Sequence, residues 1–308
     1  MPCRIVLAPL LLLVLSAAAT PSALRAAERP APANSSIADS EPLAAAISLF
    51  NAKRVPEARD QLAPIVAREP KNIRALWYLG QCELKMQRRG VAADILARAA
   101  QLAPTHAEIL ADYGSASLLR ATELGASFSA IGYARRGRTA LEQAVKLDPD
   151  NIDYREGLVQ FYTRAPGFVG GDFALAYAHV AEITRLDASR GAVIKANTLC
   201  SEKRYDEALA GCEAFLLTQP DNYLALYTLG RIASETGRGL ERGEQALRLC
   251  LQLTPRIQDP DHAGAHYRLG LIAEKSNRPA DARSAYQAAL KLEPTLEKAS
   301  TALARLQP

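Results

Sequence analysis

The sequence has few cysteines and almost no net charge. Five cysteines in 308 residues are too few for a disulfide-based scaffold. The 37 basic and 33 acidic residues leave a formal charge of +4, which is too small to favour nucleic acid or an anionic membrane surface as the partner. Apolar residues make up 49% of the chain, which excludes a wholly disordered or collagen-like protein. By length alone, about two domains are expected.

The sequence also lacks a recognisable set of catalytic or metal-binding residues. No Ser/His/Asp order, Cys/His pair or pair of carboxylates stands out by context or spacing. Of the four histidines, only His262 and His266 have the spacing of metal ligands, with Asp259 and Asp261 just before them. Helix capping and groove positions explain these four residues better. We therefore predict no catalytic residue, no metal site and no cofactor, and we expect a protein that is not an enzyme.

The first 38 residues are typical of an export signal followed by a tether. Arg4 is the one basic side chain before Ile5–Ala19, an uncharged run dominated by Leu, Val and Ala. This run is shorter than the roughly 20 residues of a membrane-spanning helix, and it fits the core of a secretory signal peptide. We predict a signal peptide over residues 1–19, with an uncleaved anchor as the alternative, and a flexible Pro/Ala/Ser-rich linker over residues 20–38.

These N-terminal features predict where the protein is located. A cleaved signal implies export, and the Ala- and Arg-rich composition favours a bacterium. We therefore expect a periplasmic or secreted protein whose mature chain has no transmembrane span.

The remainder of the chain repeats one unit. Six of seven segments end in a proline, and Ala188 stands where the fourth proline would be. The prolines are Pro70, Pro104, Pro149, Pro220, Pro255 and Pro294. The first two are 34 residues apart. A proline ends a helix because it has no N–H to donate, and the Asp-Asn pairs that follow two of these prolines supply caps for the next helix.

Small and large residues keep fixed distances from these prolines. Gly80, Ala92 and Leu96 lie 24, 12 and eight residues before the second proline. Gly270, Ala282 and Tyr286 lie at the same distances before the last one. Each unit has room for two segments of about a dozen residues with helical periodicity. We expect each glycine to cross the alanine of the partner helix, with the large residue filling the space beside the crossing.

The period, the pattern of small and large residues and the terminal proline resemble the tetratricopeptide repeat of exported bacterial proteins. The resemblance covers residues 39–294. It implies an all-α protein, a right-handed α-solenoid of about seven helix-turn-helix repeats that end near residues 70, 104, 149, 188, 220, 255 and 294. Residues 295–308 are expected to form a capping helix over the last repeat.

The third and fourth repeats are both longer than 34 residues. The interval from Pro104 to Pro149 is 45 residues, and its 11 extra residues correspond to about three helical turns. We therefore expect a lengthened hairpin with extra turns around Arg120–Ile131 and its tip near Gly125. The next interval has five extra residues, in the glycine-rich stretch at 164–172.

The glycine-rich stretch is expected to form a wide turn between two helices. A phosphate-binding loop would need a Gly-Lys-Ser/Thr ending and a preceding strand, and both are missing. Phe168 in this loop is predicted to contact a protein partner if its side chain is exposed.

The resemblance implies that the first helix of each repeat lines the concave side of the solenoid, and we expect a partner-binding groove there. The side chains about a quarter-turn from the core positions are Trp77, Gln81, Lys85, Glu156, Gln160, Arg164, Asn197, Tyr227, Arg231, Tyr267 and Lys275. This mixture suits an extended peptide. The aromatic rings can contact its side chains, the amides can hydrogen-bond its backbone, and Arg and Lys can bind its carboxylates. The alternative is that these are ordinary solvated or packing positions.

A carboxylate clamp known in the family is not expected here. Asn197 resembles one of its positions, but Val193 and Leu224 stand where lysines would be. We predict a non-catalytic adaptor that binds an extended peptide or protein partner within the cell envelope, and not nucleic acid. The alternative is a small-ligand- or metal-binding component of an envelope transport system.

Four cysteines remain after the signal: Cys82, Cys200, Cys212 and Cys250. Cys212 and Cys250 fall at core positions, where a thiol acts as a small hydrophobe. Cys200 and Cys212 lie on the paired helices of one repeat and could form a disulfide.

Overall fold

The computed structural model describes residues 40–256 and 259–306 of the chain. All of them belong to one compact unit, residues 39–308. The predicted signal peptide (1–19) and linker (20–38) lie outside the described residues.

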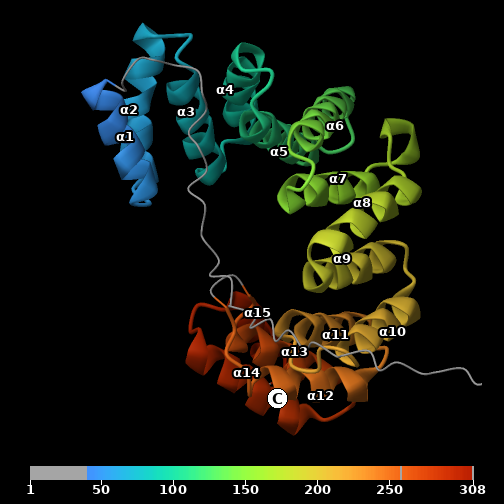
Figure 1. Cartoon of the computed structure of the whole chain (residues 1–308). Coiled ribbons are helices and arrows are strands. Elements are labelled where there is room, and N and C mark those ends of the chain that lie inside the picture. The colour runs from blue at the N-terminus through green and yellow to red at the C-terminus, as the bar shows by residue number, and fades with distance from the viewer. Residues whose placement is uncertain (1–39, 257–258, 307–308) are drawn as a thin grey trace, which may run out of the picture. The chain divides into compact units, whose positions relative to one another are not determined.

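The described residues form fifteen α-helices, one short 3-10 helix and no strand (Figure 1). The helices pair into seven hairpins, and a single helix follows the last one. The hairpins are α1 (Glu41–Asn51) with α2 (Val55–Arg68), α3 (Ile73–Lys85) with α4 (Arg89–Leu102), α5 (Ala107–Leu124) with α6 (Phe128–Leu147), α7 (Ile152–Arg164) with α8 (Phe173–Leu186), α9 (Ala188–Ser201) with α10 (Tyr205–Leu216), α11 (Tyr223–Thr236) with α12 (Leu240–Cys250), and α13 (His262–Lys275) with α14 (Pro279–Leu292). With α15 (Glu297–Arg305) after the last hairpin, the chain is an α-solenoid.

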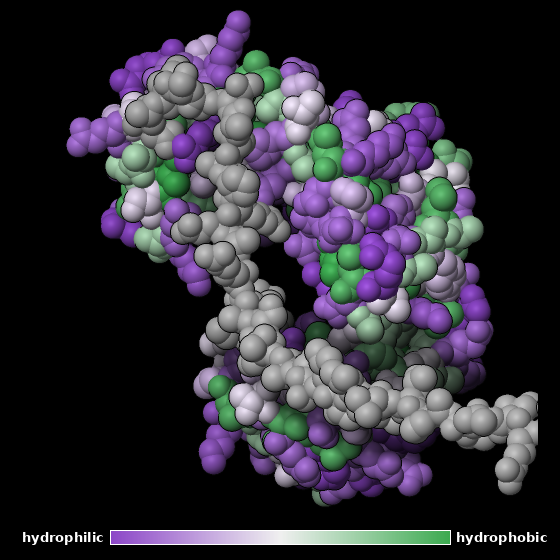
Figure 2. Space-filling model, in the orientation of Figure 1, coloured by the Kyte–Doolittle hydropathy of each residue, from purple (hydrophilic) through white to green (hydrophobic). Residues whose placement is uncertain are grey.

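The first helices of successive hairpins contact one another. α1 contacts α3, α3 contacts α5, and the series continues through α7, α9 and α11 to α13. No comparable contact joins two second helices in the part of the chain that the structure describes. The first helices therefore form the inner layer of the stack. On the face visible in Figure 2, hydrophobic residues are scattered in small patches among hydrophilic ones.

Asparagine side chains cap three of the first helices. Asn72, Asn151 and Asn222 each accept a hydrogen bond from the backbone N–H three residues later, at 3.0, 3.4 and 3.1 Å. Each bond satisfies an N–H group that has no partner within the first helical turn. The caps that the sequence predicts after two of the prolines are confirmed at Asn151 and Asn222.

Glycines of the first helices make room for large side chains of the second helices. A Cβ atom added at Gly80 would lie 2.5 Å from Cγ of Leu96, and one added at Gly270 would meet the ring of Tyr286. The spacing predicts that Ala92 and Ala282 lie against these glycines. The atoms nearest to the added Cβ atoms belong instead to Leu96 and Tyr286. Helical side chains lean toward the N-terminus, so the residue one turn after each alanine reaches back over the crossing.

The two longer repeats differ from the others at the positions that the sequence predicts. α5 and α6 have 18 and 20 residues, against nine to 14 in every other described α-helix, and they are joined at Gly125–Ser127. The glycine-rich stretch follows α7 and contains the 3-10 helix η1 (Gly167–Val169). Without the fourth terminal proline, α8 and α9 are separated by Asp187 alone.

Candidate functional site

Five of the predicted groove residues line one cavity. They lie on three consecutive first helices: Glu156, Gln160 and Arg164 on α7, Asn197 on α9 and Arg231 on α11. The wall of this cavity also includes Ser201, Tyr205, Glu235 and Arg238. We call it the polar cavity.

The volume of the polar cavity is about 860 Å³, which is within the range of cavities that hold ligands of several residues or a small molecule. Because its wall comes from three repeats, a ligand in it would contact the inner layer across more than one hairpin. The cavity therefore brings together predicted groove residues that are up to 75 positions apart, from Glu156 to Arg231.

Polar side chains link neighbouring first helices around the polar cavity. The linked residues are about one repeat apart, and each pair joins one first helix to the next. The pairs are Arg190 with Glu156 at 2.6 Å, Arg231 with Asn197, and Arg268 with Glu235 at 3.0 Å. These contacts fix the orientation of Glu156, Asn197 and Arg231 before any ligand binds.

Arg164 is different, because its guanidinium has no partner among the described residues. It lies at the C-terminal end of α7 and is exposed, and it forms no hydrogen bond or ion pair with any described residue. Gln160, one turn earlier, is also exposed and makes only a long hydrogen bond of 3.5 Å to Glu156. The guanidinium of Arg164 and the exposed amide of Gln160, at one cavity, are suited to bind a carboxylate and a peptide backbone.

Two predicted residues of the second repeat converge on Asp112 of α5. Nε1 of Trp77 and Nε2 of Gln81 donate hydrogen bonds to Oδ2 of Asp112, at 2.6 and 2.7 Å. Burial raises the pKa of Asp112, and the two hydrogen bonds offset only part of this rise. Asp112 thus holds both side chains in place at the inner layer.

Three other predicted residues lie apart from the polar cavity. Nζ of Lys85 is 5.5 Å from the centre of the Phe50 ring and faces the preceding repeat. Tyr267 is half-buried, with its ring centre 5.9 Å from that of Tyr286, and Lys275 is exposed. These residues do not share a cavity with the five residues on α7, α9 and α11.

Tyr227 is the most buried of the predicted groove residues, with 8% of its surface exposed. Arg268 of α13 lies 5.3 Å from the centre of its ring and donates from Nε to its hydroxyl at 3.0 Å. Tyr227 therefore packs between α11 and α13 and positions Arg268, and little of its ring is left to contact a partner.

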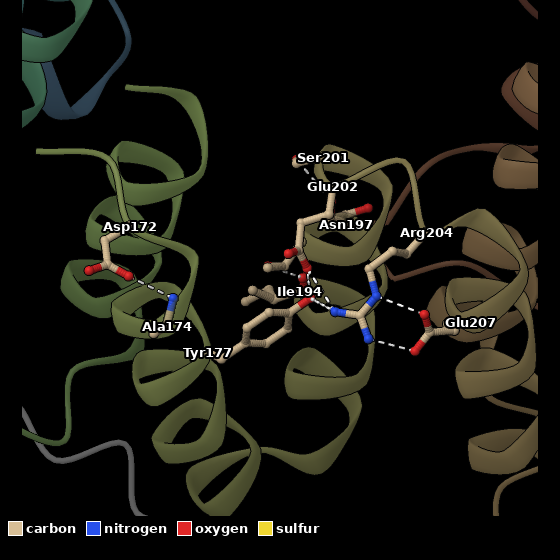
Figure 3. A network of polar contacts seen from close by, with 10 residues as sticks. Asp172, Ala174, Tyr177, Ile194, Asn197, Ser201, Glu202, Arg204 and Glu207 are labelled. Atoms are coloured by element: carbon tan, nitrogen blue, oxygen red, sulfur yellow. Dashed lines mark hydrogen bonds and ion pairs between the residues drawn. The ribbon is translucent and has the colours of Figure 1, made fainter. Parts of the chain in front are cut away.

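A hydrogen-bond network joins the fourth and fifth hairpins (Figure 3). Tyr177 of α8 donates to Glu202, and Arg204 binds Glu202 at 3.0 Å and Glu207 at 2.6 Å. Burial and the hydrogen bond to Glu202 raise the pKa of Tyr177 to about 12. The turn between α9 and α10 that this network fixes borders the polar cavity.

The histidine pair has no metal-binding geometry around it. His262 Nε2 lies 2.8 Å from the backbone oxygen of Leu253, and burial lowers the pKa of His266. Within residues 40–256 and 259–306, no three His, Cys, Asp or Glu side chains are grouped as metal ligands would be. No helix in the same ranges is both long and apolar enough to cross a bilayer.

Comparison with known proteins agrees with the repeat spacing. Two models of the tetratricopeptide repeat match the sequence, over residues 43–107 and 263–296. A tetratricopeptide repeat protein from Parabacteroides merdae has a similar fold, with a TM-score of 0.61 and 14% identity over 86% of this chain and 97% of that one. The chain is a tetratricopeptide repeat protein. Such a fold suggests a scaffold for protein–protein interaction.

Two further solved tetratricopeptide repeat proteins are similar to this one. The C-terminal part of a repeat protein from Cytophaga hutchinsonii has a TM-score of 0.49 and 14% identity over 85% of this chain and 99% of that one. A thermophilic protein of Thermus thermophilus has a TM-score of 0.45 and 16% identity over 68% of this chain and 97% of that one. No curated protein sequence matches significantly.

Several polar residues of this tetratricopeptide repeat protein's inner layer were not predicted from the sequence. Each of three such residues binds a predicted groove residue: Asp112 binds Trp77, Arg190 binds Glu156, and Glu235 binds Arg231. Their signal in the sequence is a hydrogen-bonding partner about one repeat away, since Arg190 follows Glu156 by 34 residues. Opposite charges at the repeat spacing could therefore have identified Arg190 and Glu235, but not Asp112, whose partners Trp77 and Gln81 are uncharged.

The four described cysteines of the repeat protein are free thiols. Cys200 lines the polar cavity, and Cys212 is buried on the paired helix. Burial raises the pKa of Cys200 and raises that of Cys212 to about 12, so both thiols stay protonated at neutral pH.

Proposed function

We propose that this tetratricopeptide repeat protein is a non-catalytic adaptor of the cell envelope, which binds an extended segment of a partner protein along its first helices. The observation that supports this most directly is the polar cavity, where five predicted groove residues from three repeats line one volume of about 860 Å³. The export signal predicted for residues 1–19 is the basis for placing the adaptor in the envelope.

The chemistry of the polar cavity suits a peptide. Gln160 and Asn197 offer amide groups to the backbone of an extended chain, and Arg164 offers a guanidinium to a carboxylate. Arg231 is held by Asn197 and by Glu235, so its position is set before binding and less conformational entropy is lost.

The absence of catalysis is part of the proposal. Cys200 is the thiol that lines the polar cavity, and its raised pKa makes it a poor nucleophile at neutral pH. The carboxylates of Glu156 and Glu235 are both engaged in ion pairs with arginines of the next repeat.

The proposal is tested by comparing partner retention on immobilised variants of the mature protein. Asn197→Ala with Arg231→Ala should reduce retention of the native envelope partner by about tenfold or more, because these residues lie at the centre of the site. Arg242→Ala is the matched control, since Arg242 is exposed on α12 and does not line the cavity. Equal retention by both variants would overturn the proposal.

A further inference from the structure

The two lengthened repeats together build a second cavity. Its wall comes from the distal half of the α5/α6 hairpin, from the end of α7 and from the glycine-rich loop that contains η1. The cavity has a volume of about 760 Å³. We call it the apolar pocket. The extra residues of the third repeat and those of the fourth repeat thus contribute to the same site.

The loop side of the apolar pocket is held in one conformation. Gly170 has a φ of +116°, and a Cβ atom at Gly171 would collide with the backbone oxygen of Ala165, so both positions require glycine. The backbone N–H of Asp172 donates to the oxygen of Tyr162 at 3.0 Å. The loop is therefore a fixed wall of the pocket and not a loose connection.

The apolar pocket is lined mainly by hydrophobic side chains, and Phe128 and Phe168 at its edge are 95% and 74% exposed. Large exposed aromatic rings beside an apolar hollow mark a surface that a partner covers. A ligand held inside the pocket would leave rings this exposed in water. The two phenylalanines therefore favour a partner larger than the pocket.

Among the residues that the structure describes, Arg164 is the one charged side chain that lines the apolar pocket. No described residue neutralises it, so the pocket is complementary to an apolar group that lies next to a negative charge.

The apolar pocket and the polar cavity are adjacent along α7. Gln160 and Arg164 line both of them. One extended chain can therefore lie in the polar cavity and continue past these two side chains into the apolar pocket.

We propose that the apolar pocket is a second anchoring site for the same partner segment, and that it binds an aromatic or aliphatic side chain adjacent to an acidic residue. The acidic residue binds Arg164, and the apolar side chain lies between Phe128 and Phe168. This inference rests on the proposed function, because it concerns the same partner segment and states which of that segment's side chains are recognised.

The test uses peptides selected from a random library on the immobilised mature protein. We expect the selected peptides to contain an apolar residue next to Asp or Glu. Phe128→Ser with Phe168→Ser should weaken binding of a selected peptide about tenfold or more, whereas Leu217→Ser should not change it. Leu217 is 86% exposed and lies outside both cavities, so it is a matched control. All three positions are exposed, and an unchanged melting temperature shows that the variants fold.

A charge exchange tests the role of Arg164 separately. Arg164→Glu should weaken binding of the acidic peptide, and replacing the peptide's acidic residue by Lys should restore it. Failure of this rescue would overturn the assignment of Arg164.

The outcomes separate this inference from the proposed function. Binding that depends on Asn197 and Arg231 but not on Phe128 and Phe168 would leave the groove intact and overturn the apolar pocket as an anchor. Laurate and anionic phospholipid vesicles are the comparison probes. The inference would also be overturned if either probe binds in a way that requires Phe128 and Phe168 while no selected peptide requires them.

Discussion

Gly80 of α3 and Leu96 of α4 are in such close contact that a Cβ atom at Gly80 would lie 2.5 Å from Cγ of the leucine. Leu96 is fully buried and has no room to move away. Gly80→Ala should therefore lower the free energy of unfolding by about 1–3 kcal/mol, as overpacked cores do.

Gly211→Ala is the matched control for this prediction. Gly211 is an exposed position within α10, and a Cβ atom there would meet nothing within 4 Å. Alanine is the better helix former, so this change should raise stability by up to about 1 kcal/mol. Thermal unfolding of both variants measures the effects, and a loss of stability in both would contradict the account of the crossing.

The helical hairpins were predictable because their signals are local. Prolines, small residues and Asx caps act within one or two turns of the chain, and the structure has its hairpins where these signals place them. The long α5/α6 hairpin could be predicted from one interval, since 11 residues extend two helices without rotating their core face.

The arrangement of the site was less predictable because it depends on contacts between repeats. Trp77 was selected as a groove residue, but its Nε1 donates to Asp112, 35 residues later. Tyr227 was selected by its helical position, yet Arg268 of the next first helix covers its ring. That the two longer repeats share one pocket depends on how α6 and α7 pack, which no local pattern shows.

Glu83 is a buried carboxylate that links three helices. It is 2% exposed, and it binds Arg59 of α2 at 3.1 Å and Arg88, the residue before α4, at 3.5 Å. Glu83→Ala should destabilise the protein by about 2 kcal/mol, because it removes two charged hydrogen bonds at a buried position and leaves a cavity there. Glu57→Ala removes an exposed partner of Arg54 and should cost much less. Urea unfolding of both variants checks this order, and equal losses would contradict it.

Asp112 should make stability depend on pH. Burial raises its pKa in the folded state, so its stabilising contribution is present below the unfolded-state pKa and is lost as pH rises through the folded-state pKa. Asp112→Asn keeps an oxygen for Trp77 and Gln81 but cannot titrate. The variant should therefore gain stability relative to the natural protein as pH rises from about 4 to 7. Melting temperatures of both proteins measure this, and a constant or opposite difference would refute it.

The cysteines should react slowly in the folded protein. Burial raises the pKa of Cys82 to about 11 and that of Cys250 to about 12, so the reactive thiolate is scarce at neutral pH. Iodoacetamide should label them much faster after unfolding, and mass spectrometry without reductant should find four free thiols. A mass lower by two hydrogens would show a disulfide instead.

The most direct test of the central claim is a photo-crosslink from inside the polar cavity. A photoreactive side chain placed at Ser201, which is exposed and lines the cavity, should form an adduct with a segment of the envelope partner. The same side chain at Leu217, outside the cavity, should form none. A partner adduct at Ser201 that disappears with Asn197→Ala and Arg231→Ala is the predicted result, and an adduct from Leu217 alone would contradict the account.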